Sequence, residues 1–514
     1  MSSPSTSITG SKAGITVAVM CAVLMAMIDI SIVNVALSDI RASFGTPIDQ
    51  IGWVSTGYMM ANVVVIPMTG WLQRRFGYKR YFTASILIFT AASLLCGIAW
   101  SLPSLVAFRI LQGVGGGAII PTAQSILFAR YPREEHSMAG GLFGLGAVTG
   151  PLLGPTIGGY LIEFSSWHWI FLVNLPVGIL AAFLSYRFIE EPGFEAPKDP
   201  IDGWGIGLLA VGMASLQYVL EEGNREGWDS AQILALGAVA GVALITFIVH
   251  ELETPKPVVD LRVFKNASYS AGTGINFLLG TALFSGSYLF SLYCGAVMHY
   301  TALDTGLIFL TAGTIQIALM PLIGKFGNRF DGRYLLVFGI LGASLSLWMN
   351  GHLTTQASFW DLARPQMVRA VGLSFIFIPL SVIALSDLSP DQRGNATGLF
   401  NLTRELGGSI GTAWMGMSLD NSSKLFASRL GESVSAYSPT TQEQLALLQR
   451  GVTARLPDPQ GSAVTILGLR VQVQAMIKAF NQGFVTVSVL FALGVFLVFF
   501  LKRPQPGVKI EGAH

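Results

Sequence analysis

Five charged side chains stand inside long apolar stretches of this sequence. They are Asp29, Arg109, Arg369, Arg404 and Glu405. A charge at the centre of a bilayer costs on the order of 3 kcal/mol on insertion scales. Each of these residues is therefore a candidate for a role that needs a charge or a proton at depth.

Asp29 and Arg109 have opposite charges and similar expected depths. Counting along their apolar runs places each roughly 10 Å below the outer membrane surface. An ion pair would favour the ionised carboxylate, whereas burial would favour the neutral acid. An acid held between these two effects can take up and release protons, so we expect Asp29 to carry protons. The alternative is a structural ion pair that only fixes the register of two helices.

Arg404 and Glu405 are adjacent in sequence and would point about 100° apart on a helix. We expect one to line a central cavity and the other to face a neighbouring helix, and a structural role for the pair is equally compatible with the sequence. Arg369 has no assigned role.

Polar and aromatic residues within the apolar runs are candidates for a substrate cavity. Plain helix packing is the alternative for each of them, and their mixture of aromatic, amide and apolar groups suits bulky amphipathic compounds. With the charged pair above, the candidates are Asn34, Tyr58, Asn62, Gln124, Tyr288, Tyr293, Gln316, Asn401, Arg404 and Glu405.

The composition requires that a membrane surround these residues. Hydrophobic residues make up 52% of the 514 residues and charged residues only 12%, about half the charged share of a soluble domain. The net charge of +2 gives no indication of nucleic-acid binding. The three cysteines, Cys21, Cys96 and Cys294, lie in apolar runs and form neither a disulfide framework nor a metal motif.

About 14 apolar runs are long enough to span a bilayer, so the sequence predicts an all-α membrane protein. The runs start near residues 14, 51, 81, 104, 137, 168, 203, 231, 270, 303, 334, 366, 395 and 478. Arginine and lysine gather in loops of one parity, such as the one that holds Arg74, Arg75, Lys79 and Arg80. The positive-inside rule then predicts that both termini are cytoplasmic.

Two sequence patterns recur about 255 residues apart, as expected for a duplicated transporter half. Pro67 and Gly70 correspond to Pro321 and Gly324, and the triplet at Gly141 recurs at Gly398. We therefore predict a six-helix bundle at 14–190 and a second at 270–502, with a long periplasmic loop at 420–477. Two extra helices at 201–252 are inserted between the bundles and expected outside them, and residues 1–13 and 503–514 are cytoplasmic tails.

Glycine and proline dominate the fifth run, which includes Gly150, Pro151, Gly154, Pro155, Gly158 and Gly159. These residues predict a bent, closely packed helix at the seam between the halves. No strand–turn–helix context supports a dinucleotide loop, and no phosphate-binding lysine loop occurs. Uphill transport would therefore use an ion gradient and not ATP bound by this chain, and we expect no cofactor and no metal.

Several motifs resemble the major facilitator superfamily. The stretch from Gly70 through Arg75 and Gly77 to Arg80 looks like its loop motif, and Arg109 to Gly113 looks like its fourth-span motif. The runs 29–36, 150–159 and 167–176 are similar to signatures of its fourteen-span drug:proton antiporters, the EmrB-like exporters among them. The resemblance extends over nearly the whole chain.

The resemblance implies a carrier in which two bundles rock about a central cavity. It implies proton coupling through Asp29, Arg109 and Gln112, and gating through Gly70, Arg75, Gly77 and the fifth-run glycines and prolines. It also implies a periplasmic adaptor (EmrA-like) and an outer-membrane channel (TolC-like), with 420–477 as the docking segment. Arg74 stands where the loop motif usually has an acid, so closure at that loop would use other contacts.

We therefore predict a proton-coupled antiporter that exports hydrophobic and amphipathic drugs and toxins as the inner-membrane part of a tripartite efflux system. One alternative is a dedicated exporter of a single natural metabolite, such as a siderophore or a fatty acid. Another is a membrane sensor or enzyme. The six histidines are scattered along the sequence and form no catalytic cluster, which argues against an enzyme.

Overall fold

The fold is entirely helical apart from one isolated bridge between Thr9 and Glu190 in the part of the chain described. The computed structural model describes residues 8–132, 135–192, 194–195, 201–326, 330–434, 437–452 and 458–502. The predicted C-terminal tail, 503–514, and residues 1–7 lie outside this part of the chain.

Local sequence signals set where the helices begin and end. Ser101 and Ser104 form a capping box at the start of α5 (Leu102–Arg130), and Ser358 and Asp361 form one at the start of α14 (Phe359–Ser386). These side chains satisfy backbone donors that a first helical turn leaves unpaired. Gly77 ends α3 (Trp53–Phe76) with φ of 79°, a conformation that favours glycine because it has no Cβ.

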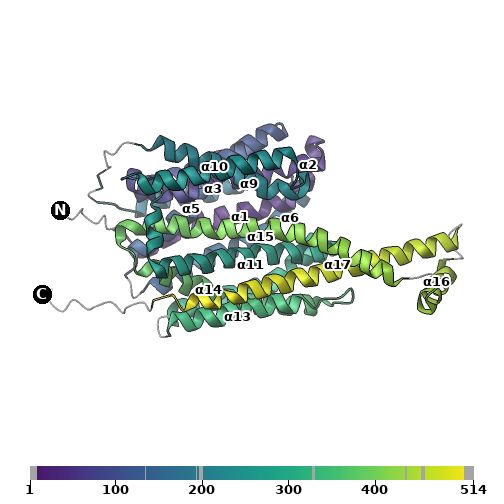
Figure 1. The fold of residues 1–514 in the computed structure, drawn as a ribbon. Coiled ribbons are helices and arrows are strands. Elements are labelled where there is room, and N and C mark those ends of the chain that lie inside the picture. The colour runs from purple at the N-terminus through teal and green to yellow at the C-terminus, as the bar shows by residue number, and fades with distance from the viewer. Residues whose placement is uncertain are drawn as a thin grey trace.

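Two bundles pack side by side and correspond to the two predicted halves (Figure 1). The N-terminal bundle consists of α1 (Lys12–Phe44), α3, α4 (Tyr78–Gly97), α5, α6 (His136–Phe164) and α8 (Asn174–Phe188), with the short α2 (Ile48–Ile51) and α7 (Trp169–Leu172). The C-terminal bundle consists of α11 (Ala267–Ala296), α12 (Ala302–Phe326), α13 (Gly332–Asn350), α14, α15 (Pro390–Ser433) and α17 (Pro459–Leu493), followed by α18 (Val495–Val498).

Eleven helices of the described chain are long and apolar enough to cross a membrane. The remaining long helices of the bundles, α3, α6 and α15, are packed against these spans, α3 on α5, α6 on α1 and α15 on α11. The all-α architecture with two bundles agrees with the sequence, whereas the count of fourteen spans stays a prediction.

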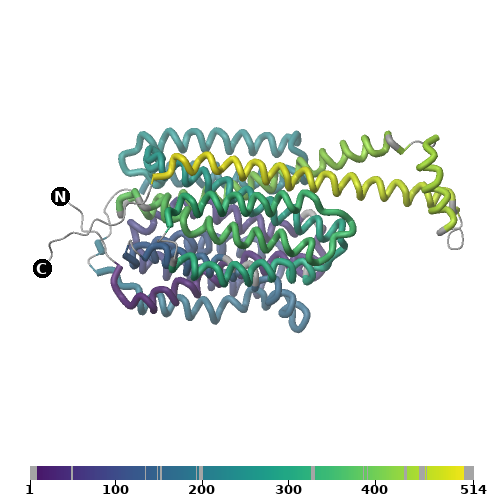
Figure 2. The backbone as a smooth tube through the Cα atoms, turned by 90° about the horizontal axis from the view of Figure 1, so that it is seen from below, coloured from purple at the N-terminus to yellow at the C-terminus, as the bar shows by residue number. Residues whose placement is uncertain are grey.

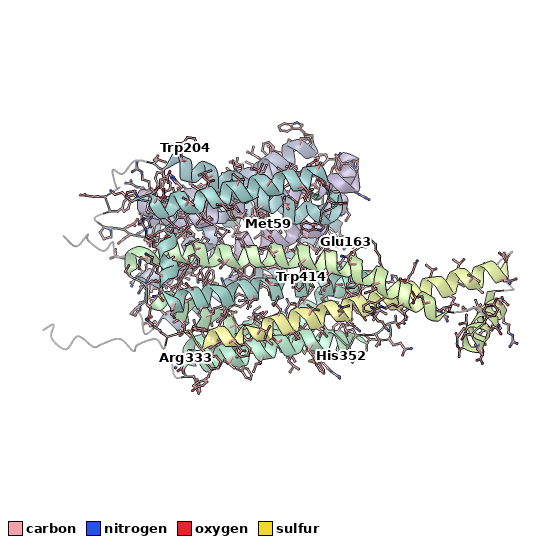
Figure 3. The ribbon with its side chains drawn as sticks, viewed as in Figure 1. Met59, Glu163, Trp204, Arg333, His352 and Trp414 are labelled. Atoms are coloured by element: carbon pink, nitrogen blue, oxygen red, sulfur yellow. The ribbon has the colours of Figure 1, made fainter. Side chains whose placement is uncertain are left out.

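The ends of the described chain lie at the same end of the molecule, which we call the terminal end (Figures 1 and 2). The opposite end, where α15 and α17 project, is the hairpin end. In Figure 3, Trp204 and Arg333 lie toward the terminal end and Glu163 and His352 toward the hairpin end. Exposed aromatic side chains occur at both, such as Trp204 at 79% and Trp100 at 74%, a distribution typical of the two membrane interfaces.

The two inserted helices, α9 (Gly203–Glu226) and α10 (Ala231–Glu253), do not both lie outside the bundles as expected. The amide of Gln217 in α9 donates to Ser409 Oγ in α15 at 3.1 Å, and Asn224 donates to the Ala413 carbonyl at 2.9 Å. On the other side, the ring of Tyr218 lies 5.3 Å from that of Trp53 in α3. Helix α9 therefore contacts both halves at their seam, and α10 packs outside it.

The segment 420–477, expected as a polar loop, is largely helical in its described part. Helix α15 continues to Ser433 and α17 starts at Pro459, so both extend beyond the bundle as a long hairpin (Figure 2). Between them α16 (Pro439–Val452) packs against α17. An α-helix satisfies its own backbone hydrogen bonds, so even a polar sequence can extend this way.

Candidate functional site

Asp29 and Arg109 form an ion pair inside the N-terminal bundle. Oδ2 of Asp29 in α1 lies 2.6 Å from Nη1 of Arg109 in α5. The residues are 0% and 1% exposed, and both helices pass through the centre of the bundle. The equal depths inferred by counting residues thus correspond to a direct contact.

Two amides complete the surroundings of the Asp29 carboxylate. Its Oδ1 accepts hydrogen bonds at 2.8 Å from Gln112 Nε2 and at 2.8 Å from Asn174 Nδ2. Both amides also donate to the hydroxyl of Ser93 in α4, at 3.2 and 3.0 Å. The Ser93 hydroxyl in turn donates to the Phe171 carbonyl at 2.9 Å. Four helices and α7 therefore converge on one carboxylate.

Arg109 has further partners that do not depend on the charge of Asp29. Its Nη1 donates to Gln112 Oε1 at 2.6 Å, and its Nε donates to the Val54 carbonyl at 3.2 Å. The Tyr58 ring lies 4.3 Å from its Cζ atom and the Phe171 ring 5.7 Å, within the range of cation–π attraction. The guanidinium would thus keep neutral partners if Asp29 became protonated.

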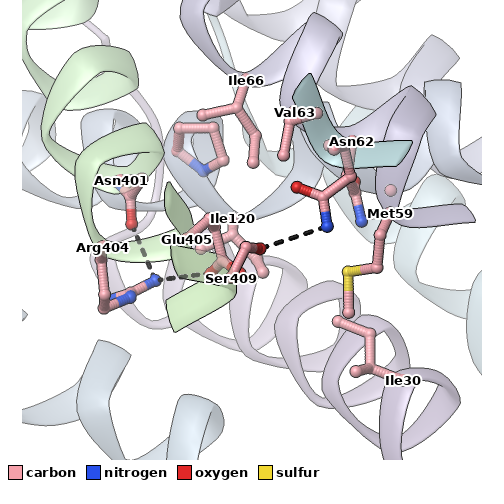
Figure 4. Close-up of a pocket in the computed structure, with 14 residues that line it drawn as sticks. Ile30, Met59, Asn62, Val63, Ile66, Ile120, Asn401, Arg404, Glu405 and Ser409 are labelled. Carbon is pink, nitrogen blue, oxygen red and sulfur yellow. Dashed lines mark hydrogen bonds and ion pairs between the residues drawn. The ribbon is translucent and has the colours of Figure 1, made fainter. Parts of the chain in front are cut away.

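A second group of polar residues lines a cavity between the bundles (Figure 4). Asn62, Asn401, Arg404 and Glu405 of the predicted set line it, together with apolar residues such as Met59. The cavity volume is about 30 Å³, room for roughly one water molecule. Drug-sized ligands occupy pockets of roughly 300–1,000 Å³, so this cavity is too small for one in this conformation.

Arg404 and Glu405 both line this cavity, which corrects the expectation that one of them faces away. Arg404 Nη2 lies 3.7 Å from Glu405 Oε1 and donates to Asn401 Oδ1 at 3.1 Å. Long side chains bend toward one another despite the angle between their Cβ atoms, because several rotatable bonds separate the charges from the backbone. Asn401 also donates to Gln124 Oε1 at 2.9 Å across the seam.

Tyr58 stands between the two polar groups. Gly116 lines the cavity, and a Cβ on Gly116 would collide with the Tyr58 hydroxyl. The same tyrosine ring covers Arg109. Tyr58, a predicted cavity residue, therefore lies between Arg109 and the cavity wall at Gly116 and does not itself line the cavity.

The remaining predicted cavity residues are dispersed. Asn34 and Tyr288 are exposed, the former accepting a hydrogen bond from the Ser55 hydroxyl at 3.4 Å. Gln316 is buried in α12 away from the cavity lining. Tyr293 donates to the Thr354 carbonyl at 2.8 Å and packs on Phe480 within the C-terminal bundle, so the prediction that it faces the cavity is wrong.

The recurring sequence patterns form the seal between the bundles at the terminal end. A Cβ on Gly70 in α3 would collide with the Asn395 backbone in α15, and one on Gly398 would lie 2.7 Å from the Ile66 carbonyl. In the related pair, a Cβ on Gly324 in α12 would lie 3.1 Å from the Ser137 carbonyl in α6. Gly70 of the first half and Gly324 of the second thus each pack against a helix of the other half.

Nothing lies within 4 Å of a Cβ placed on Gly159 in α6 or on Gly306 in α12. Between α3 and α15, α9 occupies the corresponding region. The structure is therefore the form that is closed at the terminal end.

Most of the described glycines in the fifth run contact α1 and not the other half. Side chains on Gly150, Gly154 and Gly158 would collide with Met27, Ser31 and Ile32. The seam contacts of α6 come instead from Gly141 and Gly144, near its start. This corrects the expected role of the motif at the seam: it holds α6 against the helix that carries Asp29. Pro155 lies within α6, and the side chain of Pro151 is outside the described part.

The loop after α3 is held by an acid that the sequence analysis did not single out. Glu191 accepts hydrogen bonds from the backbone of Tyr78 at 3.1 Å and of Lys79 at 3.3 Å, at the start of α4. Burial raises the pKa of the Glu191 carboxyl, and these two hydrogen bonds oppose that shift. Gly77 lies against this carboxylate, and Arg75 lies in the last turn of α3.

Sequence reasoning missed Ser93, Asn174 and Gln217 as site residues. Asn174 belongs to a run that was noted as a family signature, and its polarity within an apolar run was the available signal. Ser93 gave no such signal, because serine is common in membrane helices.

The comparisons with known proteins agree with this geometry. Residues 19–412 match the sequence pattern of the Major Facilitator Superfamily. The chain is 34% identical over 502 residues to the multidrug export protein EmrB of Haemophilus influenzae, covering 96% of each chain. It is 34% identical over 495 residues to the fatty acid resistance protein FarB of Neisseria gonorrhoeae, again covering 96% of each.

A solved structure shares the fold at much lower sequence identity. The human organic anion transporter MFSD10 (TETRAN) superposes with a TM-score of 0.62 and is 12% identical, with 95% of this chain and 100% of that chain covered. At this identity the similarity concerns the fold alone.

Proposed function

The chain belongs to the major facilitator superfamily, and from that premise we propose that it exports hydrophobic and amphipathic drugs and toxins in exchange for protons. It is a secondary transporter and a multi-pass protein of the bacterial inner membrane. The name of the Haemophilus influenzae relative, a multidrug export protein, supports drugs as the cargo.

The observation that carries proton coupling is the burial of Asp29 against Arg109 at 2.6 Å. A proton on Asp29 would abolish the ion pair and weaken the attraction between α1 and α5. Arg109 would lose its counter-charge but retain Gln112 Oε1 and the Val54 carbonyl, which offsets part of the cost of breaking a buried ion pair. Such an acid can change its charge without destroying the bundle around it.

Coupling to the drug would run through Tyr58. The ring covers Arg109 on one side, and its hydroxyl lies against Gly116, which lines the cavity of Glu405 and Arg404. A drug that enlarges this cavity would displace Tyr58 and alter the environment of the ion pair. Drug and proton would then compete through one network, which is the requirement for exchange.

We place the structure at one step of an alternating cycle. With the terminal end cytoplasmic, the seal at Gly70 and Gly398 would be the closed inner gate, and we assign this form to the outward-facing half of the cycle, with the Asp29–Arg109 pair intact. Protonation from the periplasm would release Arg109 and allow the carrier to turn inward. Drug binding from the cytoplasm would then favour proton release, and the loaded carrier would turn outward.

The positive-inside distribution of arginine and lysine supports this orientation, with both termini cytoplasmic. The hairpin of α15 and α17 would then project into the periplasm. We assign it as the docking site of an EmrA-like adaptor, which would connect the exporter to a TolC-like channel. Whole-cell dye efflux, measured with and without the adaptor and with and without a protonophore, tests this assembly. Efflux that persists without the adaptor or in the presence of the protonophore would contradict it.

The decisive test compares Asp29→Asn with Asp39→Asn, an exposed acid on the same helix. Proteoliposomes with correctly folded Asp29→Asn should lose drug-stimulated proton movement, whereas Asp39→Asn and Asp29→Glu should keep it. Asp29→Glu controls for a merely structural defect, because it restores the titratable group. Full coupling in Asp29→Asn would refute the assignment.

One observation favours the narrower alternative of a dedicated exporter. The Neisseria gonorrhoeae relative, as similar as the multidrug protein, is named for fatty acid resistance. Growth of cells challenged with chemically unrelated toxins separates the two, because a dedicated exporter would protect against one class only.

A further inference from the structure

Arg369 is a cation inside the C-terminal bundle that has no carboxylate partner in the described chain. Its Nη2 donates to the Ser287 hydroxyl at 2.8 Å, and its Cζ lies 5.9 Å from the Phe309 ring. Its buried Nη1 donates to no described atom. Arg109, by contrast, is paired with Asp29 at 2.6 Å. Arg369 is half-buried, and a buried guanidinium nitrogen without an acceptor is costly unless an anion joins it.

The internal repeat shows what the C-terminal bundle lacks. The offset that carries Gly141 to Gly398 also carries Gln112 to Arg369 and Arg109 to Gln366. The arginine and the glutamine have exchanged places, one helical turn apart on the same face. The second bundle therefore also has one arginine and one glutamine at these two positions, but in the reverse order.

The 257-residue offset of Gly141 and Gly398 leads from Asp29 to Gly286 in α11, whereas the 254-residue offset of Gly70 and Gly324 leads to Leu283; the position of Gly286 beside Arg369 favours the first register. A Cβ placed on Gly286 would lie 3.8 Å from Nη1 of Arg369. The residue at this position therefore has no side chain in the second bundle, and the side chain of Leu347 packs against it, 2.9 Å from the same Cβ. A ligand that reaches the guanidinium here would enter where Leu347 now packs.

We propose that Arg369 binds the carboxylate or sulfonate of amphipathic organic anions, at the position that corresponds to Asp29 in the other bundle. This site rests on the proposed export function and specifies a class of its substrates. The anion would take the place of the missing acid, and Nη1 and the Ser287 hydroxyl would donate to it. Phe309 would contact the apolar body of the ligand.

A neighbouring side chain also lacks partners. Gln366 is 1% exposed, and neither its Nε2 nor its Oε1 has a hydrogen-bond partner among the described atoms. Buried side-chain amides normally have hydrogen-bond partners in a folded protein. A polar ligand group, or water that accompanies it, would satisfy both Gln366 and Arg369.

The test measures binding of 1-naphthaleneacetate and of its neutral amide, 1-naphthaleneacetamide, by calorimetry. The full-length protein is placed in phosphatidylcholine nanodiscs, and empty discs are subtracted. A hydrogen-bonded charge pair of this kind should make the acid bind about 10- to 100-fold more tightly than the amide. Arg369→Gln should abolish this preference, and Arg369→Lys should keep part of it.

Arg364→Gln is the matched control, because Arg364 is an exposed arginine on the same helix; it should leave the preference unchanged. Equal binding of acid and amide by the unaltered protein, or a preference that survives in Arg369→Gln, would overturn the proposal. Loss of acid binding when the discs contain phosphatidylglycerol would assign the site to lipid headgroups and refute its role in substrate binding. The assay involves no proton gradient, so its outcome is independent of the Asp29 test.

Discussion

Replacing Asp29 with Asn should destabilise the N-terminal bundle by about 3–5 kcal/mol, the cost of removing one partner of a buried ion pair. Three donors converge on this carboxylate, from Arg109 at 2.6 Å and from Gln112 and Asn174 at 2.8 Å each. An asparagine offers one oxygen, and its amide nitrogen would face at least one of these donors. Arg109 would also lose the charge that compensates it.

A double-mutant cycle isolates the pair from these other losses. Arg109→Gln alone leaves a buried carboxylate, whereas Asp29→Asn combined with Arg109→Gln leaves no buried charge. The double variant should therefore be more stable than the sum of the single losses predicts, by on the order of 3 kcal/mol. Equilibrium unfolding in mixed micelles measures the free energy of unfolding of all four proteins. Asp39→Asn, at an exposed acid, is the control and should change this free energy by close to zero. Additivity within about 0.5 kcal/mol would refute the reasoning.

Three further variants examine other parts of the structure. Gly70→Leu should overpack the α3–α15 seal by about 1–3 kcal/mol and slow dye efflux, whereas Gly237→Leu, at a glycine with open space around it, should not. Gln217→Ala should lower the unfolding free energy by about 1 kcal/mol through loss of the Ser409 hydrogen bond, measured by unfolding in micelles; no change would contradict a seam role for α9. Because the pKa of Glu191 is raised by burial, its ionisation costs stability. Melting temperatures of the unaltered protein should therefore fall as pH rises from the ordinary carboxyl range through that pKa, and Glu191→Gln should reduce this trend, to which other buried acids also contribute.

The sequence was sufficient for the bundles and for the ion pair. Apolar periodicity and the rise per residue placed Asp29 and Arg109 at the same depth. Two opposite charges at one depth in hydrocarbon have few partners other than each other. The repeat predicted two halves, and its glycines proved to be where the halves touch. The family signature around 167–176 contained Asn174 but gave no reason for its position.

Features that depend on side-chain reach or on polar helices could not be read in this way. Hydropathy detects helices that face lipid, but the extension of α15 is polar and needs no lipid. The angle between Arg404 and Glu405 on a helical wheel ignores the length of their side chains. Tyr293 looks like any polar aromatic in a span, and only the packing on Phe480 shows that it faces its own bundle.

Helices α15 and α17 run without a break from the C-terminal bundle into the projecting hairpin. At 1.5 Å per residue, the 44 residues of α15 extend roughly 66 Å. A continuous rod of this length acts as a lever, so a few degrees of tilt in the bundle move the far tip by several ångströms. A protein gripping that tip would sense mechanically which way the carrier faces, without touching the cargo or the proton.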